Sequence, residues 1–302
     1  MSGAVILDLD LIINSGSFLH KLFDCLKGST EASLTFTKNN IIYNELINGS
    51  SSANEPYPNM FNSFEINPNN VGYYNYSFTT EEYIICFEVS IFKSKIKDTL
   101  YKDKIRIYKP KSEDRIYISI EKPDVENTGV SYIEPLFMQN INHYVVASSG
   151  RDENNPSWTV HPKNFKTDCA KCATNEKITF VCYPTYMEVQ ANSSSKNNGH
   201  VALYGSRSSP IPVNLSNINF DLGYINSDRN FKVNYVKVNV STGNNKESLD
   251  INVTPNIIKT LSKRTKLSPE PIKFFLEDDH IKIVTTIKDY CIFRTYLRNS
   301  IV

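Results

Sequence analysis

The segment from Leu249 to Val302 constrains the fold of this chain most, because it contains a helix with two chemically different faces. Thr254 and Pro255 predict where that helix begins, since threonine caps free backbone N–H groups and proline fits the first helical position. At about 100° per residue, the helix has an apolar stripe opposite a basic one. The apolar stripe consists of Ile257, Ile258, Leu261 and Thr265, and the basic stripe of Lys259, Lys263 and Lys266. The apolar stripe therefore needs a sheet to cover, and the lysines need an anion.

Two alternating runs follow this helix, at Ile272–Leu276 and Ile281–Ile287. Alternation of apolar and polar residues is typical of strands with one buried face. The acidic residues Glu277–Asp279 between the runs predict a turn. The chain is therefore expected to end with a strand, a cationic helix and an antiparallel hairpin that finishes at Tyr296 and Leu297.

Three earlier segments show the same division into an apolar face and a lysine-bearing face. The expected helices run from Phe18 to Lys27, from Ser90 to Leu100 and from Pro162 to Ala173. In the second of them, Phe92, Ile96 and Leu100 are expected to face inward. Short alternating segments rich in Tyr, Phe and Ile fill most of the remaining chain and favour strands. The sequence therefore predicts an α+β protein with helices laid on antiparallel sheets.

The order of expected elements repeats once along the chain. Each half begins with a strand and a helix, continues with several strands, and then has a second helix followed by more strands. The pattern breaks at 138–156, where a polar segment ending in Pro156 predicts an exposed connector. The repeat is one of architecture rather than of residue identity. We therefore expect two domains, 1–137 and 157–302, joined by the connector 138–156.

Composition limits the class of protein. The net charge of +1 over 302 residues conceals an uneven distribution, with lysines on the expected helices and acidic residues at turns. No apolar run approaches the roughly 18 to 20 residues of a membrane-spanning helix, and the N-terminus lacks the basic region of a secretory signal. The chain is therefore expected to be intracellular.

The cysteines offer one candidate for metal or redox chemistry. Of the six, only Cys169 and Cys172 have suitable spacing, and no second pair completes a zinc site. On the expected helix both thiols share the apolar stripe with Phe165, so we interpret them as reduced core residues. The five histidines form no H-E-x-x-H pattern, and no glycine-rich phosphate loop is present. No cofactor and no metal are expected.

Two tandem halves of this kind, joined by an extended connector, resemble a DNA sliding clamp of the proliferating cell nuclear antigen type. The resemblance covers nearly the whole chain and is most specific at its end. There, the segment Leu249–Val253, the helix through Lys266, the residues Leu267–Pro269 and the closing hairpin resemble the last elements of that family. The Asn- and Lys-rich composition is compatible with a divergent, viral member.

The resemblance implies a function without catalysis. Such clamps are usually homotrimeric rings whose helices surround duplex DNA, and they act as processivity factors that tether DNA polymerase and other replication proteins. Lysines on the helices would contact phosphates independently of sequence. The nucleus or a viral replication site would be the location. We carry a DNA-binding role onto Lys21, Lys27, Lys93, Lys95, Lys97, Lys163, Lys166, Lys171, Lys259, Lys263 and Lys266. For any single lysine, a solvated helix face is the alternative.

Partner binding in this family resembles capture of a short aromatic-containing peptide beside the connector. The corresponding residues are Met138, Ile141, Tyr144, Val145, Val146, Pro269, Pro271, Tyr296 and Leu297. The alternative is that these residues close the core of their own domain. The chain also departs from the family, because it ends at Arg298–Val302 without an acidic tail.

Three other interpretations remain open. The segment Asp8-Leu9-Asp10 resembles the nucleophile motif of haloacid-dehalogenase-type phosphatases, although the alternating α/β units of that fold are missing. A monomeric DNA-binding polymerase or transcription accessory factor could use the clamp fold and hold DNA by charge alone. A β-rich structural or surface protein would suit the N-x-S/T sites at Asn48, Asn75, Asn192, Asn214, Asn239 and Asn252, but it leaves the lysine-faced helices unexplained.

Overall fold

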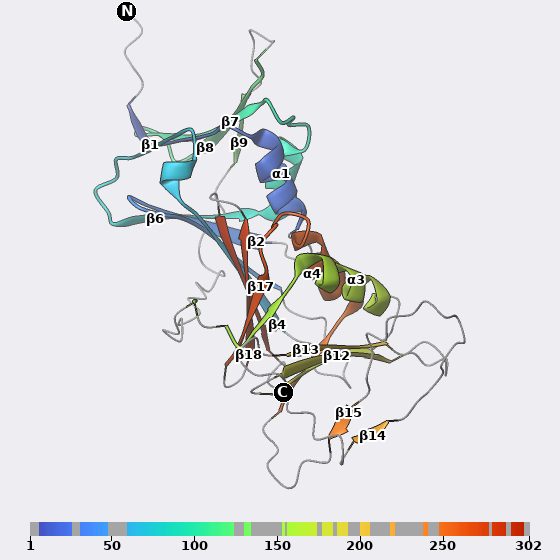
Figure 1. The fold of residues 1–302 in the computed structure, drawn as a ribbon. Coiled ribbons are helices and arrows are strands. Elements are labelled where there is room, and N and C mark those ends of the chain that lie inside the picture. Colours follow the sequence, from blue (N-terminus) through green and yellow to red (C-terminus); the bar gives the residue numbers. More distant parts are fainter. Residues whose placement is uncertain are drawn as a thin grey trace, which may run out of the picture.

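The computed structural model describes most of the chain outside its long loops. The described residues are 6–25, 31–47, 59–123, 130–133, 153–154, 156–173, 177–183, 186–192, 200–205, 218–220, 238–240, 248–277, 280–287 and 291–298. Within them the molecule is an α+β protein of antiparallel sheets and four α-helices (Figure 1).

The first half has the order strand, helix, strands, helix, strands. Its elements are β1 (Leu7–Ile13), α1 (Gly16–Asp24), β2 (Glu31–Thr37), β3 (Ile41–Ile47), β4 (Asn59–Ile66), the 3₁₀ turn η1 (Pro68–Asn70), β5 (Tyr73–Tyr76), β6 (Glu82–Glu88), α2 (Val89–Ile96), β7 (Lys104–Pro110), β8 (Ile116–Glu121) and β9 (Val130–Ile133).

The second half follows the same order. Its elements are β10 (Trp158–Val160), α3 (Pro162–Cys172), β11 (Lys177–Cys182), β12 (Tyr186–Asn192), β13 (His200–Gly205), β14 (Ile218–Phe220), β15 (Val238–Val240), β16 (Leu249–Val253), α4 (Pro255–Arg264), β17 (Ile272–Leu276), β18 (His280–Ile287) and β19 (Cys291–Arg298). The strands β14 and β15 form a small separate ribbon.

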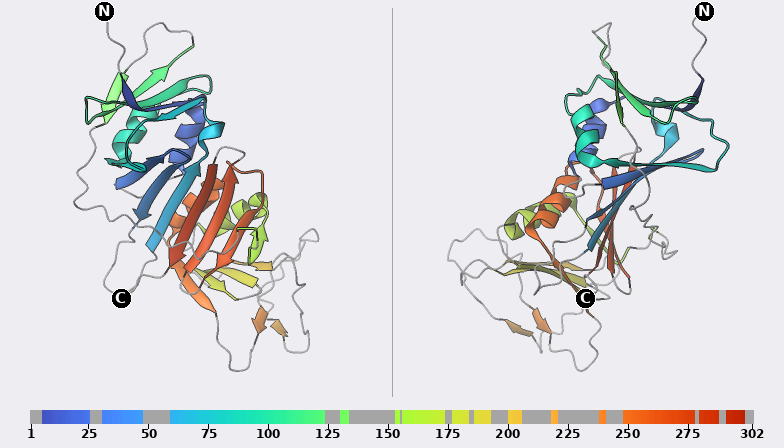
Figure 2. Two further views of the ribbon diagram at one scale, coloured as in Figure 1. Left: turned by 90° about the vertical axis from the view of Figure 1, so that its left-hand side faces the viewer. Right: turned by 180° about the vertical axis from the view of Figure 1, so that it is seen from behind.

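An eight-stranded sheet with the order β10-β17-β18-β19-β4-β3-β2-β6 belongs to both halves. The left view in Figure 2 shows it running without a break from the blue and cyan strands to the red ones. The halves meet where β19 pairs antiparallel with β4, in a register that sets Phe293 opposite Phe64 and Leu297 opposite Met60. This β19–β4 pairing is called the internal seam below.

The internal seam depends on a strand that the sequence analysis did not separate. The hairpin of β17 and β18 was expected and is present, but it is followed by a further strand, β19, rather than ending the chain at Tyr296 and Leu297. The physical reason is that Cys291–Arg298 pairs antiparallel with β18 along its whole length, so this segment is a strand of its own. The expectation of two closing strands is therefore wrong.

Each half has one further sheet. The first half has a five-stranded sheet of the order β5-β1-β7-β8-β9, and the second has a four-stranded sheet of the order β13-β12-β11-β16. Pairings recur between the halves, because β1 pairs with β7 as β10 pairs with β17, and β2 pairs with β6 as β11 pairs with β16. The expected architectural repeat is therefore visible in the strand pairing.

Two hydrophobic clusters fill the space between helices and sheets. The first contains Leu22 and Phe23 of α1 together with Phe92 of α2, and the second contains Phe165 of α3 together with Ile258 of α4. Each cluster also takes in strands of the sheets beneath its helices. Apolar burial on this scale is the main driving force for folding, at roughly 25 cal/mol per Å² of surface removed from water.

Helix α4 begins as its sequence predicts, whereas α1 and α2 depart from their expected bounds. The Thr254 side chain accepts a hydrogen bond from the Ile257 N–H, as its position before Pro255 predicts. Helix α1 begins at Gly16, and its N-cap Ser15 makes no side-chain cap bond, so the expected start at Phe18 is two residues late. Helix α2 ends at Ile96, and Leu100 in the following turn is 67% exposed, so its expected inward orientation is wrong.

Candidate nucleic-acid interface

All four helices lie on one side of the molecule, and the eight-stranded sheet lies on the other. The right view in Figure 2 shows this arrangement, with α1 and α2 above α3 and α4. Every one of these helices carries at least one lysine, and within them the carboxylates are limited to Asp24 and Asp168. The helical face therefore combines residues of both halves into one basic surface.

The structure leaves the predicted lysines accessible to a partner. Those that are exposed are Lys21, Lys97, Lys163, Lys166, Lys171, Lys259 and Lys266, and those of intermediate exposure are Lys93, Lys95 and Lys263. Lys97 and Lys266 lie just beyond the last helical residues, and Lys27 is outside the described residues. The lysines thus lie at the helix surface, as the helical period predicts. Their role in binding DNA stays a prediction.

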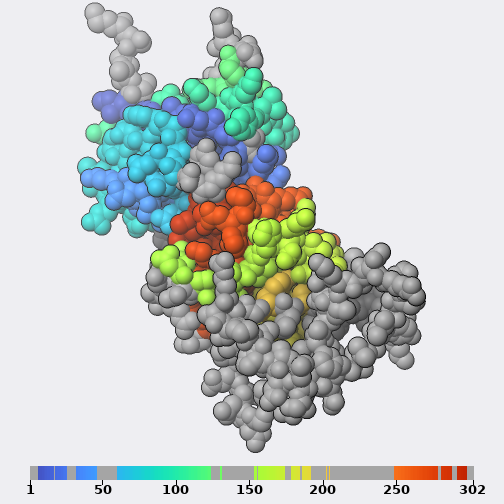
Figure 3. Space-filling model, in the orientation of Figure 1, coloured from blue at the N-terminus to red at the C-terminus, as the bar shows by residue number. Residues whose placement is uncertain are grey.

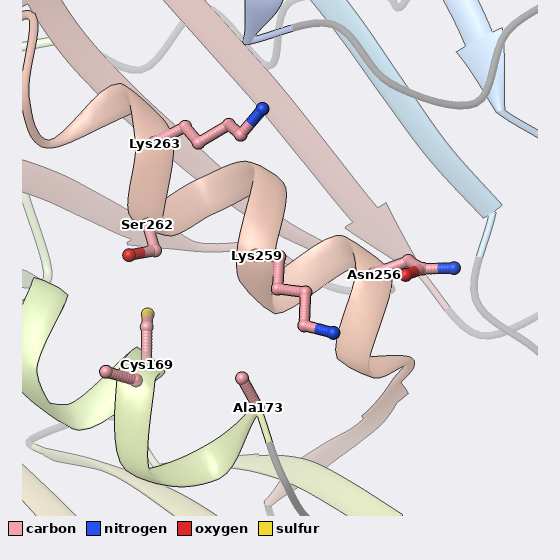
Figure 4. Close-up of a pocket in the computed structure, with 7 residues that line it drawn as sticks. Cys169, Ala173, Asn256, Lys259, Ser262 and Lys263 are labelled. Atoms are coloured by element: carbon pink, nitrogen blue, oxygen red, sulfur yellow. The ribbon is translucent and has the colours of Figure 1, made fainter.

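A groove of about 670 Å³ lies between α3 and α4. Figure 3 shows the yellow-green atoms of the α3 region packed against the orange atoms of the α4 region. One wall is made by small side chains of α3 and the other by polar and basic side chains of α4. Figure 4 shows Cys169 and Ala173 directed toward α4, with Ser262 and Lys259 beside them. The lining residues are Cys169, Ala170, Ala173, Asn256, Lys259, Ser262 and Lys263.

Lys263 also connects the two halves. Its Nζ lies 3.5 Å from the backbone carbonyl oxygen of Asp24, at the C-terminal end of α1. A cation is favoured there, because the last carbonyl groups of a helix carry partial negative charge. Helices α1 and α4, which belong to different halves of the chain, are therefore adjacent on the helical side of the molecule.

Arg264 is the important residue that the sequence analysis missed. Its side chain is 2% exposed, lies 4.0 Å above the Phe293 ring and donates to Asn62 Oδ1 at 2.7 Å and to the Thr295 hydroxyl. It thereby joins α4 to both strands of the internal seam. Burial lowers the pKa of the guanidinium to about 10. The sequence did contain a signal for this burial, because Arg264 follows Leu261 by three positions and so lies on the apolar stripe of the helix.

Glu45 belongs to the same buried cluster. Its carboxylate accepts hydrogen bonds from the Tyr43 hydroxyl at 2.9 Å and from Asn62 Nδ2 at 2.6 Å. Burial raises the pKa of Glu45, although Asn62, Tyr43 and the charge of Arg264 oppose the rise. Asn62 thus accepts a hydrogen bond from Arg264 and donates one to Glu45. It links an acidic residue of the first half to a basic residue of the second half.

The outer face of the eight-stranded sheet holds one end of the expected connector. The Glu153 carboxylate accepts from Arg294 Nε at 2.7 Å and lies 2.7 Å from Lys282 Nζ, and Arg294 also pairs with Glu65 at 3.0 Å. Burial acts to raise the pKa of Glu153, but the hydrogen bonds from Arg294 and Lys282 outweigh it and lower the pKa. The chain just before β10 is therefore fixed to the sheet by charge.

The predicted peptide-binding residues are only partly brought together. Tyr296 lies against Phe61 and His280, with ring centroids 5.7 Å away from its own in each case. Leu297 is fully buried in the core of the second half, as the alternative interpretation held. Pro269 and Pro271 are exposed in the loop before β17, at the opposite end of the β17–β18 hairpin from Tyr296. Met138, Ile141, Tyr144, Val145 and Val146 lie outside the described residues.

The residues of the rival hypotheses have structural partners. Asp10 receives two hydrogen bonds from Arg106, at 2.7 and 2.8 Å, and Asp8 lies 3.3 Å from Lys109 Nζ. Both aspartates therefore serve as partners of basic residues on the neighbouring strand β7.

Cys169 and Cys172 are buried free thiols, as predicted, and burial raises the pKa of Cys172 to about 12. Such thiols are poor metal ligands and poor nucleophiles, because the thiolate is the reactive form. Among the residues that the structure describes, no three His, Cys, Asp or Glu side chains gather as a metal site requires.

Comparison with solved structures identifies the architecture. A crystal structure of proliferating cellular nuclear antigen from Entamoeba histolytica matches 98% of this chain and 100% of its own, with a TM-score of 0.62 and 8% sequence identity. The chain has a sliding-clamp fold. No family model and no curated protein matches the sequence, so the likeness is one of fold.

The sliding-clamp fold agrees with the α+β class and the paired helices expected from the sequence. The match extends over both halves of the chain. No helix in the described part of the chain has the length and apolar character needed to cross a membrane.

Proposed function

We propose that this chain is a DNA sliding clamp, a processivity factor without catalysis of its own that encircles duplex DNA and tethers a polymerase and other replication proteins. The fold supports the proposal, and so does the basic face built from all four helices. The nucleus or a viral replication site is the proposed location, and the domains 1–137 and 157–302 with the connector 138–156 are part of the proposal.

The observation that carries the proposal is the internal seam. By the internal repeat, β19 of the second half corresponds to β9 of the first, and β4 of the first half corresponds to β13 of the second. Whereas β19 pairs with β4, both β9 and β13 end their sheets in the described part of the chain. An open sheet edge favours pairing with another strand. Pairing β9 of one copy with β13 of the next would therefore repeat the internal seam between copies.

Exposed apolar side chains on β9, on the adjacent helix α2 and in the turn after α2 support this head-to-tail contact. Val130 on β9 is 57% exposed, Ile91 on the adjacent helix α2 is 43% exposed, and Leu100 and Tyr101 after α2 are 67% and 76% exposed. In a monomer these side chains would remain in water, at a cost of up to about 1.5 to 3 kcal/mol for each fully exposed one. A heterologous contact that repeats the same rotation closes into a ring, and a homotrimer is the proposed form.

In such a ring the helical face would line the hole and meet the phosphates of duplex DNA. Lysines contact phosphates without reading bases, so the attraction would be independent of sequence and sensitive to salt. Once the ring is closed, DNA is held by topology, and the individual contacts can remain weak.

Retention on end-blocked DNA tests this function. The protein is allowed to thread onto linear duplex DNA, both ends are then blocked with a bulky group, and the salt concentration is raised. A ring stays on the blocked DNA and slides off an unblocked control. A monomeric accessory factor held by charge leaves both molecules as counterions compete, and that result would overturn the clamp proposal.

A further inference from the structure

Two cations lie side by side on the outer face of the eight-stranded sheet. Ile281 and Ile283 are buried in the cluster beneath the helices, so Lys282 between them points to the opposite face, because side chains alternate along a strand. Arg294 reaches the same outer face from the neighbouring strand β19, where its register partner is Val284. The left view in Figure 2 looks onto this face, with the sheet in front of the helices. Strand pairing on both sides of β18 and β19 therefore fixes the two cations relative to each other.

One carboxylate, that of Glu153, binds both cations. Its Oε1 lies 2.7 Å from Lys282 Nζ and accepts a hydrogen bond from Arg294 Nε at 2.7 Å, and its Oε2 accepts one from Arg294 Nη2 at 3.2 Å. Lys273 Nζ donates to the backbone carbonyl oxygen of Glu153 at 3.1 Å. Two parallel bonds from one guanidinium are the strongest common way to bind a carboxylate. Lys273, Lys282 and Arg294 are called the carboxylate notch below.

The cations of the carboxylate notch are more buried than the acid. The side chain of Lys282 is 6% exposed and that of Arg294 is 19% exposed, whereas that of Glu153 is 28% exposed. Lys282 Nζ also lies 5.3 Å from the centre of the Phe275 ring, and Arg294 pairs with Glu65 at 3.0 Å. A buried cation without an anionic partner is costly. If Glu153 leaves, another anion must therefore take its place beside Lys282.

The acid is attached less firmly than the cations. Strands β18 and β19 are inner strands of the sheet, whereas Glu153 lies in a turn ahead of β10, at one end of the described sheet order. Beyond that turn the Ser157 hydroxyl accepts a hydrogen bond from the Leu276 N–H at 3.1 Å. The cationic half of the site thus belongs to paired strands, and the acidic half is one partly exposed side chain. Another carboxylate can therefore replace Glu153 without a change in strand pairing.

We propose that the carboxylate notch is a binding site for an acidic side chain of a partner protein, and that Glu153 occupies it while the partner is absent. A carboxylate suits the site because its two oxygens match the fork of Arg294. A partner's aspartate or glutamate on the outer face supplies that group, and its binding releases the chain just before β10. The inference needs neither DNA nor a ring, so it is independent of the proposed function.

The first test is rescue of the E153A variant by acetate in the full-length chain. The variant empties the carboxylate notch, so its midpoint of urea unfolding is expected to lie below that of the wild type. Acetate, which replaces chloride at constant ionic strength, is expected to recover at least half of that loss and to saturate. The matched control E81A removes an exposed carboxylate before β6 and should respond to acetate no more than the wild type does. An unchanged midpoint for E153A, or no rescue of it, would overturn the inference.

The E153A/K282M variant locates the rescue. Methionine keeps most of the apolar volume of the lysine stem and removes its charge, so the fold can accommodate it at this buried position. Acetate is expected to lose most of its effect on this variant, because one of the two cations that bind the carboxylate is absent. Equal rescue of E153A and E153A/K282M would place the acetate elsewhere and contradict a site at the carboxylate notch.

Two synthetic peptides distinguish the side chain of a partner from a free carboxylate. One has the sequence of residues 150–156, and in the other Asp152 and Glu153 are replaced by Asn and Gln. The acidic peptide is expected to rescue E153A at a lower concentration than acetate does, and the neutral peptide is expected to have no effect. Inorganic phosphate is tested beside them, and a stronger rescue by phosphate than by either carboxylate would show a general anion site and overturn the inference.

Hydrogen exchange in the wild type tests the replacement of Glu153 itself. The acidic peptide is expected to speed exchange of the backbone amides of Asn154 and Ser157, because the chain before β10 loses its contact with the sheet. The neutral peptide at the same concentration is the control. Unchanged exchange at these amides, at a peptide concentration that fully rescues E153A, would show that a partner's acid does not replace Glu153 and would overturn the proposal.

Discussion

At the scale of the residue, Arg264 shows how one side chain can join two halves of a chain. Its guanidinium stacks on Phe293 and donates to Asn62 and Thr295, so one charge contacts both strands of the internal seam. Burying a charge is costly unless hydrogen bonds and neighbouring groups compensate. The arrangement therefore makes the seam specific, because a slipped register would leave the same charge without its partners.

Replacing Arg264 by alanine is expected to lower the free energy of unfolding by about 3 kcal/mol or more, because Asn62 and Thr295 lose a buried partner and a cavity remains. The methionine variant, which keeps apolar volume, is expected to lose less than the alanine variant. Urea unfolding at neutral pH measures both, with Lys266→Ala as an exposed control expected to change stability by about 0.5 kcal/mol or less. A loss below about 1 kcal/mol for Arg264→Ala would contradict this role.

Glu153 gives a prediction for the dependence of stability on pH. Although burial acts to raise it, the hydrogen bonds from Arg294 and Lys282 lower the pKa of Glu153 in the folded protein below the ordinary value of a glutamate. The carboxylate therefore stabilises the fold fully above the unfolded pKa, and this contribution disappears as the pH falls through the folded pKa. In a comparison of unfolding free energies, Glu153→Gln should be less stable than the wild type at pH 7, and the difference should shrink below about pH 4. A constant difference at all pH values would show that the ion pairs contribute no pH dependence.

At the scale of the element, the four helices were predictable and the seam was not. Helix faces follow from the 3.6-residue period, and Ile257, Ile258 and Leu261 are buried where that period places them. The pairing of β19 with β4 joins positions more than two hundred residues apart along the chain, at Arg294 and Ser63 for example. No local pattern contains that register. The turn that exposes Leu100 was missed for a related reason, since apolar periodicity continues past the last helical residue.

The candidate site likewise has one part that the sequence predicted and one part that it did not. The lysines of α3 and α4 were predicted from their own helices, but the groove between them results from the packing of two segments separated by strands β11 to β16. The small residues Ala170 and Ala173 gave no signal in the sequence, because small side chains on an exposed face are unremarkable by themselves. They form a groove wall only because α4 packs opposite them.

The apolar turn after α2 carries a prediction about assembly. Replacing both Leu100 and Tyr101 by aspartate should weaken association of copies at least ten-fold without lowering monomer stability, because both side chains are exposed within one chain. Sedimentation over a range of concentrations measures the effect. Tyr73→Asp is the matched control, since Tyr73 is 49% exposed on β5 at the other edge of the same sheet. If the control dissociates the assembly as strongly as the double variant, the α2–β9 edge is not the contact.

At the scale of the whole molecule, one pattern of strand pairing explains both the shape of the chain and its proposed assembly. The internal seam joins the two halves so that their helices form one basic face, and the corresponding edges, β9 and β13, end their sheets. If copies join as the halves do, each added copy extends both the sheet layer and the helical layer. The proposed function requires that the successive copies close into a ring.

The solution mass, measured by light scattering at several protein concentrations, tests that requirement most directly. The account predicts a species near three times the chain mass of 34.4 kDa, with a fraction that rises with concentration. A strict monomer at every concentration would contradict the ring and leave a clamp-fold subunit that can hold DNA only by charge.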